Sequence, residues 1–104
     1  MKEGTMLDRA ALLAAAEQLV AGAEVVVEGR TSRVTRTGSQ RLRIAKFIAA
    51  GREYQATEQN PEKPSRWGQM ARQGKRVVQF RDLETNKYIA VAVDGKLFEY
   101  GKRE

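Results

Sequence analysis

The apolar residues near the N-terminus recur with the spacing of one helical face. They are Leu12, Leu13, Ala16, Leu19 and Val20. Thr5 and Asp8 have the spacing of a capping box, and Gly22 stands where a C-terminal glycine cap belongs. The pattern predicts a helix over residues 6–21. Its many alanines favour close packing on a flat partner such as a sheet.

After Gly22 the hydrophobic period shortens to that of strands. β-Branched residues predict a strand over 24–28 and another over 33–37, separated by a turn at Gly29-Arg30. Residues 52–58 predict a return strand, with Tyr54 and Ala56 on one face. Residues 24–58 are therefore predicted to form a first β-meander.

Residues 41–49 fit two patterns. Leu42 and Ile44 alternate with arginines as in a strand, although the alternation breaks at Ala45-Lys46, where a bulge would be needed. The same residues also fit a helix capped by Ser39. We favour the strand, because the flanking segments resemble hairpins, and leave the helix as the alternative.

The C-terminal half predicts a polar loop with a short helix over 59–75 and a second meander over 76–100. Ser65 caps the helix, which spans about 65–73, although Gly68 inside it is unfavourable. The apolar run 88–93 predicts a central strand covered on both faces. Asp94-Gly95 is a strong hairpin signal.

Together these elements predict one α+β domain over residues 1–104, with a frayed tail at 101–104. The N-terminal helix is expected to pack on a strongly curved antiparallel sheet, or small half-open barrel, of about six to seven short strands. The short helix near 65–73 is inserted between the two meanders.

The composition excludes much chemistry. The chain contains no cysteine and no histidine, so thiol or imidazole nucleophiles and nitrogen- or sulfur-bound metals are excluded. None of its glycines forms a phosphate-loop or dinucleotide-binding pattern. We therefore expect a non-enzymatic protein without cofactor or metal, and leave a small enzyme that acts through carboxylates or tyrosine as a third alternative. The sequence contains no run of 18 consecutive apolar residues, so no membrane span is predicted. We expect a cytoplasmic protein.

The distribution of charge along the chain is the one feature of the sequence that points to a function. The net charge is +6, and residues 29–52 carry seven basic residues and no acidic one. Arg41 and Arg43 are expected to project together from one strand face. We predict a polyanion-binding surface, most naturally for RNA or DNA. Its residues are Arg33, Arg36, Arg41, Arg43, Lys46 and Arg52. The equally weighted alternative is a solvated face whose arginines pair with the acids of the N-terminal helix.

The aromatic residues allow a second function. We expect Trp67 to seat the short helix on the sheet. Alternatively, it forms a partner contact with Arg66 and Arg72, because tryptophan and arginine are frequent at interfaces. The remaining rings of the second meander are expected in the core: Phe80, Tyr88, Phe98 and Tyr100. The alternative function is a protein-interaction or homo-oligomerisation domain that uses the apolar strand 88–93, an exposed edge strand or an apolar patch.

Overall fold

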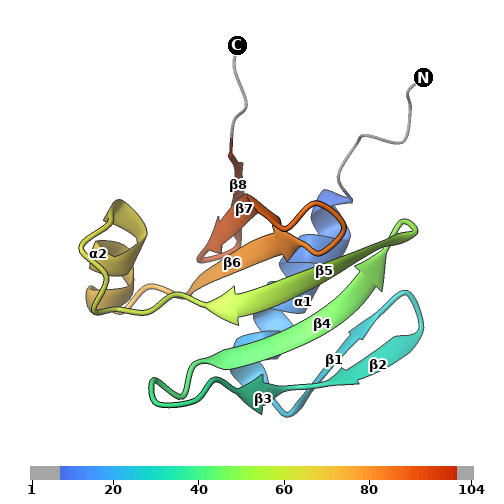
Figure 1. Cartoon of the computed structure of the whole chain (residues 1–104), viewed down its shortest axis with the longest axis horizontal. Helices are drawn as coiled ribbons and strands as arrows, with labels where there is room; N and C mark the ends of the chain where they lie inside the picture. Colours follow the sequence, from blue (N-terminus) through green and yellow to red (C-terminus); the bar gives the residue numbers. More distant parts are fainter. Residues whose placement is uncertain (1–7, 101–104) are drawn as a thin grey trace.

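The computed structural model describes residues 8–100. Its elements are α1 (Arg9–Ala21), β1 (Glu24–Val27), β2 (Arg30–Arg33), β3 (Thr35–Arg36), β4 (Arg43–Ala49), β5 (Arg52–Glu58), α2 (Arg66–Arg72), β6 (Val77–Asp82), β7 (Lys87–Val93) and β8 (Lys96–Glu99). Strands β3 to β8 form a six-stranded antiparallel sheet in sequence order, and β1 and β2 form a separate hairpin. The α+β class, with the N-terminal helix on an open antiparallel sheet, is confirmed (Figure 1).

Helix α1 begins at Arg9, three positions later than predicted. Asp8 is its N-cap, and the Asp8 side chain accepts a hydrogen bond from the Ala11 N–H. The predicted partner Thr5 lies outside the described residues. Gly22 does end the helix, but its backbone is extended rather than left-handed, so this position does not require glycine.

The predicted strand 33–37 is divided. Residues Arg30–Arg33 pair with β1, whereas Thr35–Arg36 pair with β4. Eight short strands result within the described residues, and the β1–β2 hairpin lies beside β4 where β3 ends (Figure 1). The hairpin turn falls at Glu28 and Gly29, one residue earlier than predicted. Both have positive φ, as a two-residue turn that follows the sheet twist requires.

Residues 43–49 form a strand, not a helix, and the predicted bulge at Ala45-Lys46 is wrong. Ala45 pairs with Ala56 and Lys46 with Gln55 without interruption. The inward residues of β4 are therefore Ala45, Phe47 and Ala49, while the larger isoleucines of this strand point to the other face. The small inward alanines let α1 approach the sheet closely.

The main core lies between α1 and the sheet. Leu12 and Leu19 of α1 are fully buried against it, together with Phe80. Phe47 stacks on Tyr54 at 5.6 Å and meets Phe80 edge-on at 6.1 Å. A second, smaller cluster forms on the opposite face. It consists of Val77, Val91 and Val93, covered by Trp67, Met70 and Ala71 of α2 and by Tyr100.

Candidate functional site

The two faces of the six-stranded sheet have different surroundings. Helix α1 lies behind the sheet in Figure 1, and among residues 8–100 the opposite face is covered by α2 at one end. We call this second surface the open face. Its side chains follow from the register, because residues directly opposite one another in paired strands share a face. Its strand residues outside the cluster under α2 are Thr35, Ile44, Lys46, Ile48, Glu53, Gln55, Thr57, Gln79, Arg81, Tyr88, Lys96 and Phe98.

Every ion pair among residues 8–100 belongs to the helix side of the sheet. Arg9 pairs with Glu99, Arg43 with Glu58, and Arg52 with both Asp82 and Glu84. Neither Glu17, Glu24 nor Glu28 takes part in these pairs. The alternative in which Glu17, Glu24 or Glu28 pairs with the arginines is therefore wrong for the described residues, and Glu3 lies outside them. The neutralising carboxylates come from β5, from β6 and the turn after it, and from β8.

Two of the six predicted polyanion-binding residues are held in these pairs. The Arg43 guanidinium lies 2.9 Å from Glu58 Oε2, and the Arg43 backbone N–H donates to Glu58 Oε1 at 2.9 Å. Arg52 donates to Asp82 Oδ2. Burial alone would raise the pKa of Asp82. The hydrogen bonds from Arg52 and from the Glu84 N–H, together with the Arg52 charge, outweigh burial and hold the pKa below its ordinary value.

Arg36 and Arg41 lie at the edge of the sheet, around the turn between β3 and β4. The Arg36 guanidinium donates to the Arg41 carbonyl oxygen at 2.9 Å. Arg41 adopts φ +57° in the turn, before β4 begins. The expectation that Arg41 and Arg43 project together from one strand is therefore wrong. Of the predicted set, only Arg33 and Lys46 remain close to the open face.

Lys46 begins a row of polar side chains across the open face. The register aligns Lys46 with Gln55, Gln55 with Arg81, and Arg81 with Tyr88, across four adjacent strands. Arg81 forms no ion pair within the described range, and its Nε is shielded without a hydrogen-bond partner. A cavity of about 360 Å³ beside Lys46 is bordered by Arg33 and Gln55. Arg81 lies outside the basic segment of the sequence, so the charge count along the chain did not identify it.

Two aromatic rings expected in the core lie instead on the open face. Tyr88 is 50% exposed and Phe98 is 42% exposed. A β-bulge explains why Tyr88 lies on the open face. Ala90 pairs with Phe80, but the next pair is Tyr88 with Arg81, so Ile89 is the extra residue. Without the bulge, Tyr88 would share the helix-side parity of Ala90. The predicted burial was confirmed for Phe80, which is 0% exposed, and in part for Tyr100.

Helix α2 brings a third ring to the edge of this surface. Trp67 seats the helix on the sheet, as predicted, and its ring lies 5.8 Å from Phe98 and 6.5 Å from Tyr100. The Arg66 guanidinium lies over the Trp67 ring at 5.0 Å. Arg72 instead donates to the Pro61 and Lys63 carbonyl oxygens, which anchors the preceding loop to the helix. Arg66 and Trp67 thus lie together, and Arg72 serves the loop.

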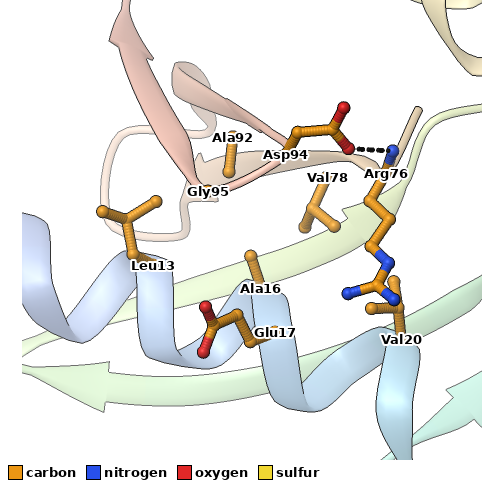
Figure 2. Close-up of a pocket in the computed structure, with 9 residues that line it drawn as sticks. All are labelled: Leu13, Ala16, Glu17, Val20, Arg76, Val78, Ala92, Asp94 and Gly95. Carbon is orange, nitrogen blue, oxygen red and sulfur yellow. Dashed lines mark hydrogen bonds between the residues drawn. The ribbon is translucent and has the colours of Figure 1, made fainter.

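A cavity on the helix side offers less chemistry. It measures about 240 Å³ and lies between α1 and the β7–β8 turn, with Leu13, Ala16 and Val78 among its apolar walls (Figure 2). Such a volume lies below the range of about 300–1,000 Å³ common for small-molecule sites. At its rim, the Asp94 carboxylate already accepts a hydrogen bond from the Arg76 N–H at 2.8 Å. We interpret this cavity as space left by the small side chains of Ala16 in α1 and Ala92 in β7.

Comparison with models of protein families, with curated proteins and with solved structures finds no match to this chain. No helix within residues 8–100 is both long and apolar enough to cross a membrane. In the same part of the chain, acidic side chains form no cluster that could hold a metal ion. The chemistry of the open face therefore rests on its own geometry.

Proposed function

We propose that this protein is a small non-enzymatic module that binds nucleic acid through the open face of its sheet. The observation that carries the proposal is the sorting of charge between the two faces. On the helix side, carboxylates of neighbouring strands pair with Arg43 and Arg52. On the open face, Lys46, Arg81 and Lys96 have no ion pair, and Glu53 is the only acidic residue among the strand positions of that face in residues 8–100.

Unpaired cations on one face suit a polyanion. Each phosphate contact releases condensed counterions, so affinity gains from cations that are not already neutralised. Arg33, beside Lys46, extends the basic surface toward β2. Arg43 and Arg52 contribute less in this proposal, because a phosphate would have to displace the carboxylates that they already contact.

A protein partner is the competing occupant. The apolar run 88–93 cannot recruit one by strand pairing, because β7 lies between β6 and β8 and both of its edges are already paired. The cores of protein interfaces are depleted of lysine, whereas Lys46 lies in the middle rows of the open face. Charge therefore favours the nucleic acid.

The test is the anisotropy of a fluorescein-labelled RNA strand and of the same sequence in DNA, titrated from low to physiological salt. Wild type should bind, with the logarithm of affinity falling linearly with the logarithm of salt concentration. The double variant Lys46→Gln/Arg81→Gln should lose about 0.7 from the magnitude of the slope for each single-strand phosphate contact removed.

The matched control is Arg30→Gln/Lys75→Gln, which removes the same charge from the first residue of β2 and from the loop after α2. Its slope should stay close to that of wild type. Equal losses in both double variants would show a diffuse response to net charge and would overturn the assignment to the open face. Absence of wild-type binding at low salt would overturn the function itself.

A further inference from the structure

We infer that the nucleic acid bound by the open face is single-stranded, with bases stacked on Tyr88 and Phe98 and phosphates held by Lys46 and Arg81. The inference rests on the proposed function and adds the class of ligand. The class of ligand is inferred from the exposed aromatic rings of Tyr88 and Phe98, whereas the proposed function was inferred from the charges.

The first argument is the exposure of the two rings. Val26, Tyr88 and Phe98 are the large apolar side chains exposed within residues 8–100, and both rings lie on the open face. Single-strand binders combine a basic surface with aromatic side chains on which unpaired bases stack. Phosphates of a duplex could be held by the cations alone, because duplex bases are already stacked on one another and offer no free face.

The second argument is the bulge at Ile89. Bulges often re-aim a side chain next to a functional site. Here the bulge turns Tyr88 away from the core and places it directly opposite Arg81. Ile89 packs against the main core in its place, so the bulge keeps an apolar side chain on the helix side and exposes the Tyr88 ring beside an unpaired cation.

The third argument is the spatial order of the groups. Two neighbouring rows cross the strands of the open face. One contains Lys46, Gln55, Arg81 and Tyr88, and the next contains Ile44, Thr57, Gln79, Val91 and Phe98. Cations therefore lie between the rim at Arg33 and the rings, and half-buried amide and hydroxyl groups lie among them. Such groups can reach the base edges that an unpaired strand exposes.

Helix α2 extends the ring surface at the other end. Trp67 lies 5.8 Å from Phe98 with its ring plane tilted by 36°, and the Arg66 guanidinium covers Trp67. Arginine planes and aromatic rings both stack with bases. A nucleic-acid strand that runs from Arg33 to α2 would thus meet the cations of the open face first and its aromatic rings afterwards.

The experiment compares one labelled strand of about 12 nucleotides with the same strand annealed to its complement. Wild type should prefer the single strand by at least about tenfold. Each of Tyr88→Leu and Phe98→Leu should weaken single-strand binding about tenfold, since one base stacked on one ring contributes about this much. Duplex binding and the salt slope should not change in these variants, because no cation is removed.

Two control variants and two further measurements keep the test specific. Tyr88→Phe keeps the ring and should bind like wild type, while Val26→Ser, an exposed apolar residue of β1, should also bind like wild type. Thermal melts should show that the leucine variants fold. Trp67 is the only tryptophan of the chain and lies against Phe98, so its fluorescence should change when the single strand binds and not when the duplex does.

The outcomes separate the two proposals. Binding of both probes with equal affinity, and unchanged by the leucine variants, would overturn the single-strand inference and leave the nucleic-acid function standing. Failure of wild type to bind either probe at low salt would overturn the function. A dimer in sedimentation that Tyr88→Leu dissociates would show a second copy on the open face and would overturn the inference as well.

Discussion

Arg52 donates two hydrogen bonds to one carboxylate oxygen of Asp82, from Nε at 3.1 Å and from Nη2 at 2.7 Å. The other oxygen, Oδ1, accepts from the Glu84 N–H at 2.8 Å. One buried carboxylate thus ties the start of β5 to the turn that follows β6. The charge pattern alone assigned Arg52 to polyanion binding. In the structure Arg52 instead links two segments of the fold.

This carboxylate predicts an acid-sensitive contribution to stability. Because the folded-state pKa of Asp82 lies below its ordinary value, its contribution is present above the unfolded carboxyl pKa, about 4, and is lost as pH falls below it toward the folded value. Asp82→Asn should lower the free energy of unfolding at pH 7 by about 1–3 kcal/mol. Urea midpoints should therefore fall less between neutral and acidic pH in the variant than in wild type. Glu62→Gln, in the exposed loop before α2, serves as the control and should keep the wild-type pH dependence.

Gly68 predicts a reversal of ordinary helix propensity. Alanine in place of glycine usually stabilises a helix by about 1 kcal/mol. At this position, however, an added Cβ would lie 2.2 Å from the Lys63 carbonyl oxygen. Gly68→Ala should therefore destabilise the protein by about 1–3 kcal/mol, measured by thermal melting, and should shift Trp67 emission as α2 moves. Gln69→Ala, at the exposed next position, should not. A raised melting temperature for Gly68→Ala would show that the loop around Lys63 moves away from the added methyl group without a cost in stability.

The burial of Val91 predicts how much the smaller hydrophobic cluster contributes to the stability of the protein. Val91 is fully buried at the centre of β7, beneath α2, as its place in the apolar run indicated. Val91→Ala should cost about 1–3 kcal/mol through lost burial and the cavity left behind. The measurement is the urea midpoint, with Val26→Ala as the exposed counterpart. Equal midpoints for the two variants would mean that α2 does not seal this cluster.

Local signals in the sequence predicted most of the elements. Helical spacing located α1, Ser65 located the start of α2, and Asp94-Gly95 located the β7–β8 turn, where both residues have positive φ. These features depend on a few neighbouring residues, so a single sequence contains them. The division between β2 and β3 left no local signal, because it depends on which strand each half pairs with.

The candidate site was less predictable for the same reason. Lys46, Arg81 and Tyr88 are far apart in sequence and are brought together only by the register of four strands. The bulge at Ile89 then reverses the side of Tyr88, which an uninterrupted alternation cannot show. Charge counting found Lys46 and Arg33 but could not separate them from Arg43 and Arg52, whose carboxylate partners come from other strands.

Arg41 and Arg43 predict opposite behaviour, although they are two residues apart in one basic segment. Arg43 binds Glu58 through both its backbone N–H and its guanidinium, whereas Arg41 is exposed in a turn. Arg43→Gln should therefore lower the free energy of unfolding by about 1 kcal/mol, a modest value because both side chains are partly exposed. Arg41→Gln should stay within about 0.5 kcal/mol of wild type.

The double variant Arg43→Gln/Glu58→Gln tests whether the ion pair is the cause of that loss. Removing both charges should recover part of the stability, because Glu58 is no longer a half-buried carboxylate without its partner. Nucleic-acid titrations should show the converse pattern. Arg43→Gln should leave the salt slope unchanged, since its charge is already neutralised, while Arg33→Gln should reduce it. A slope reduced by Arg43→Gln as much as by Arg33→Gln would mean that phosphate displaces Glu58, and it would extend the interface around the edge of the sheet.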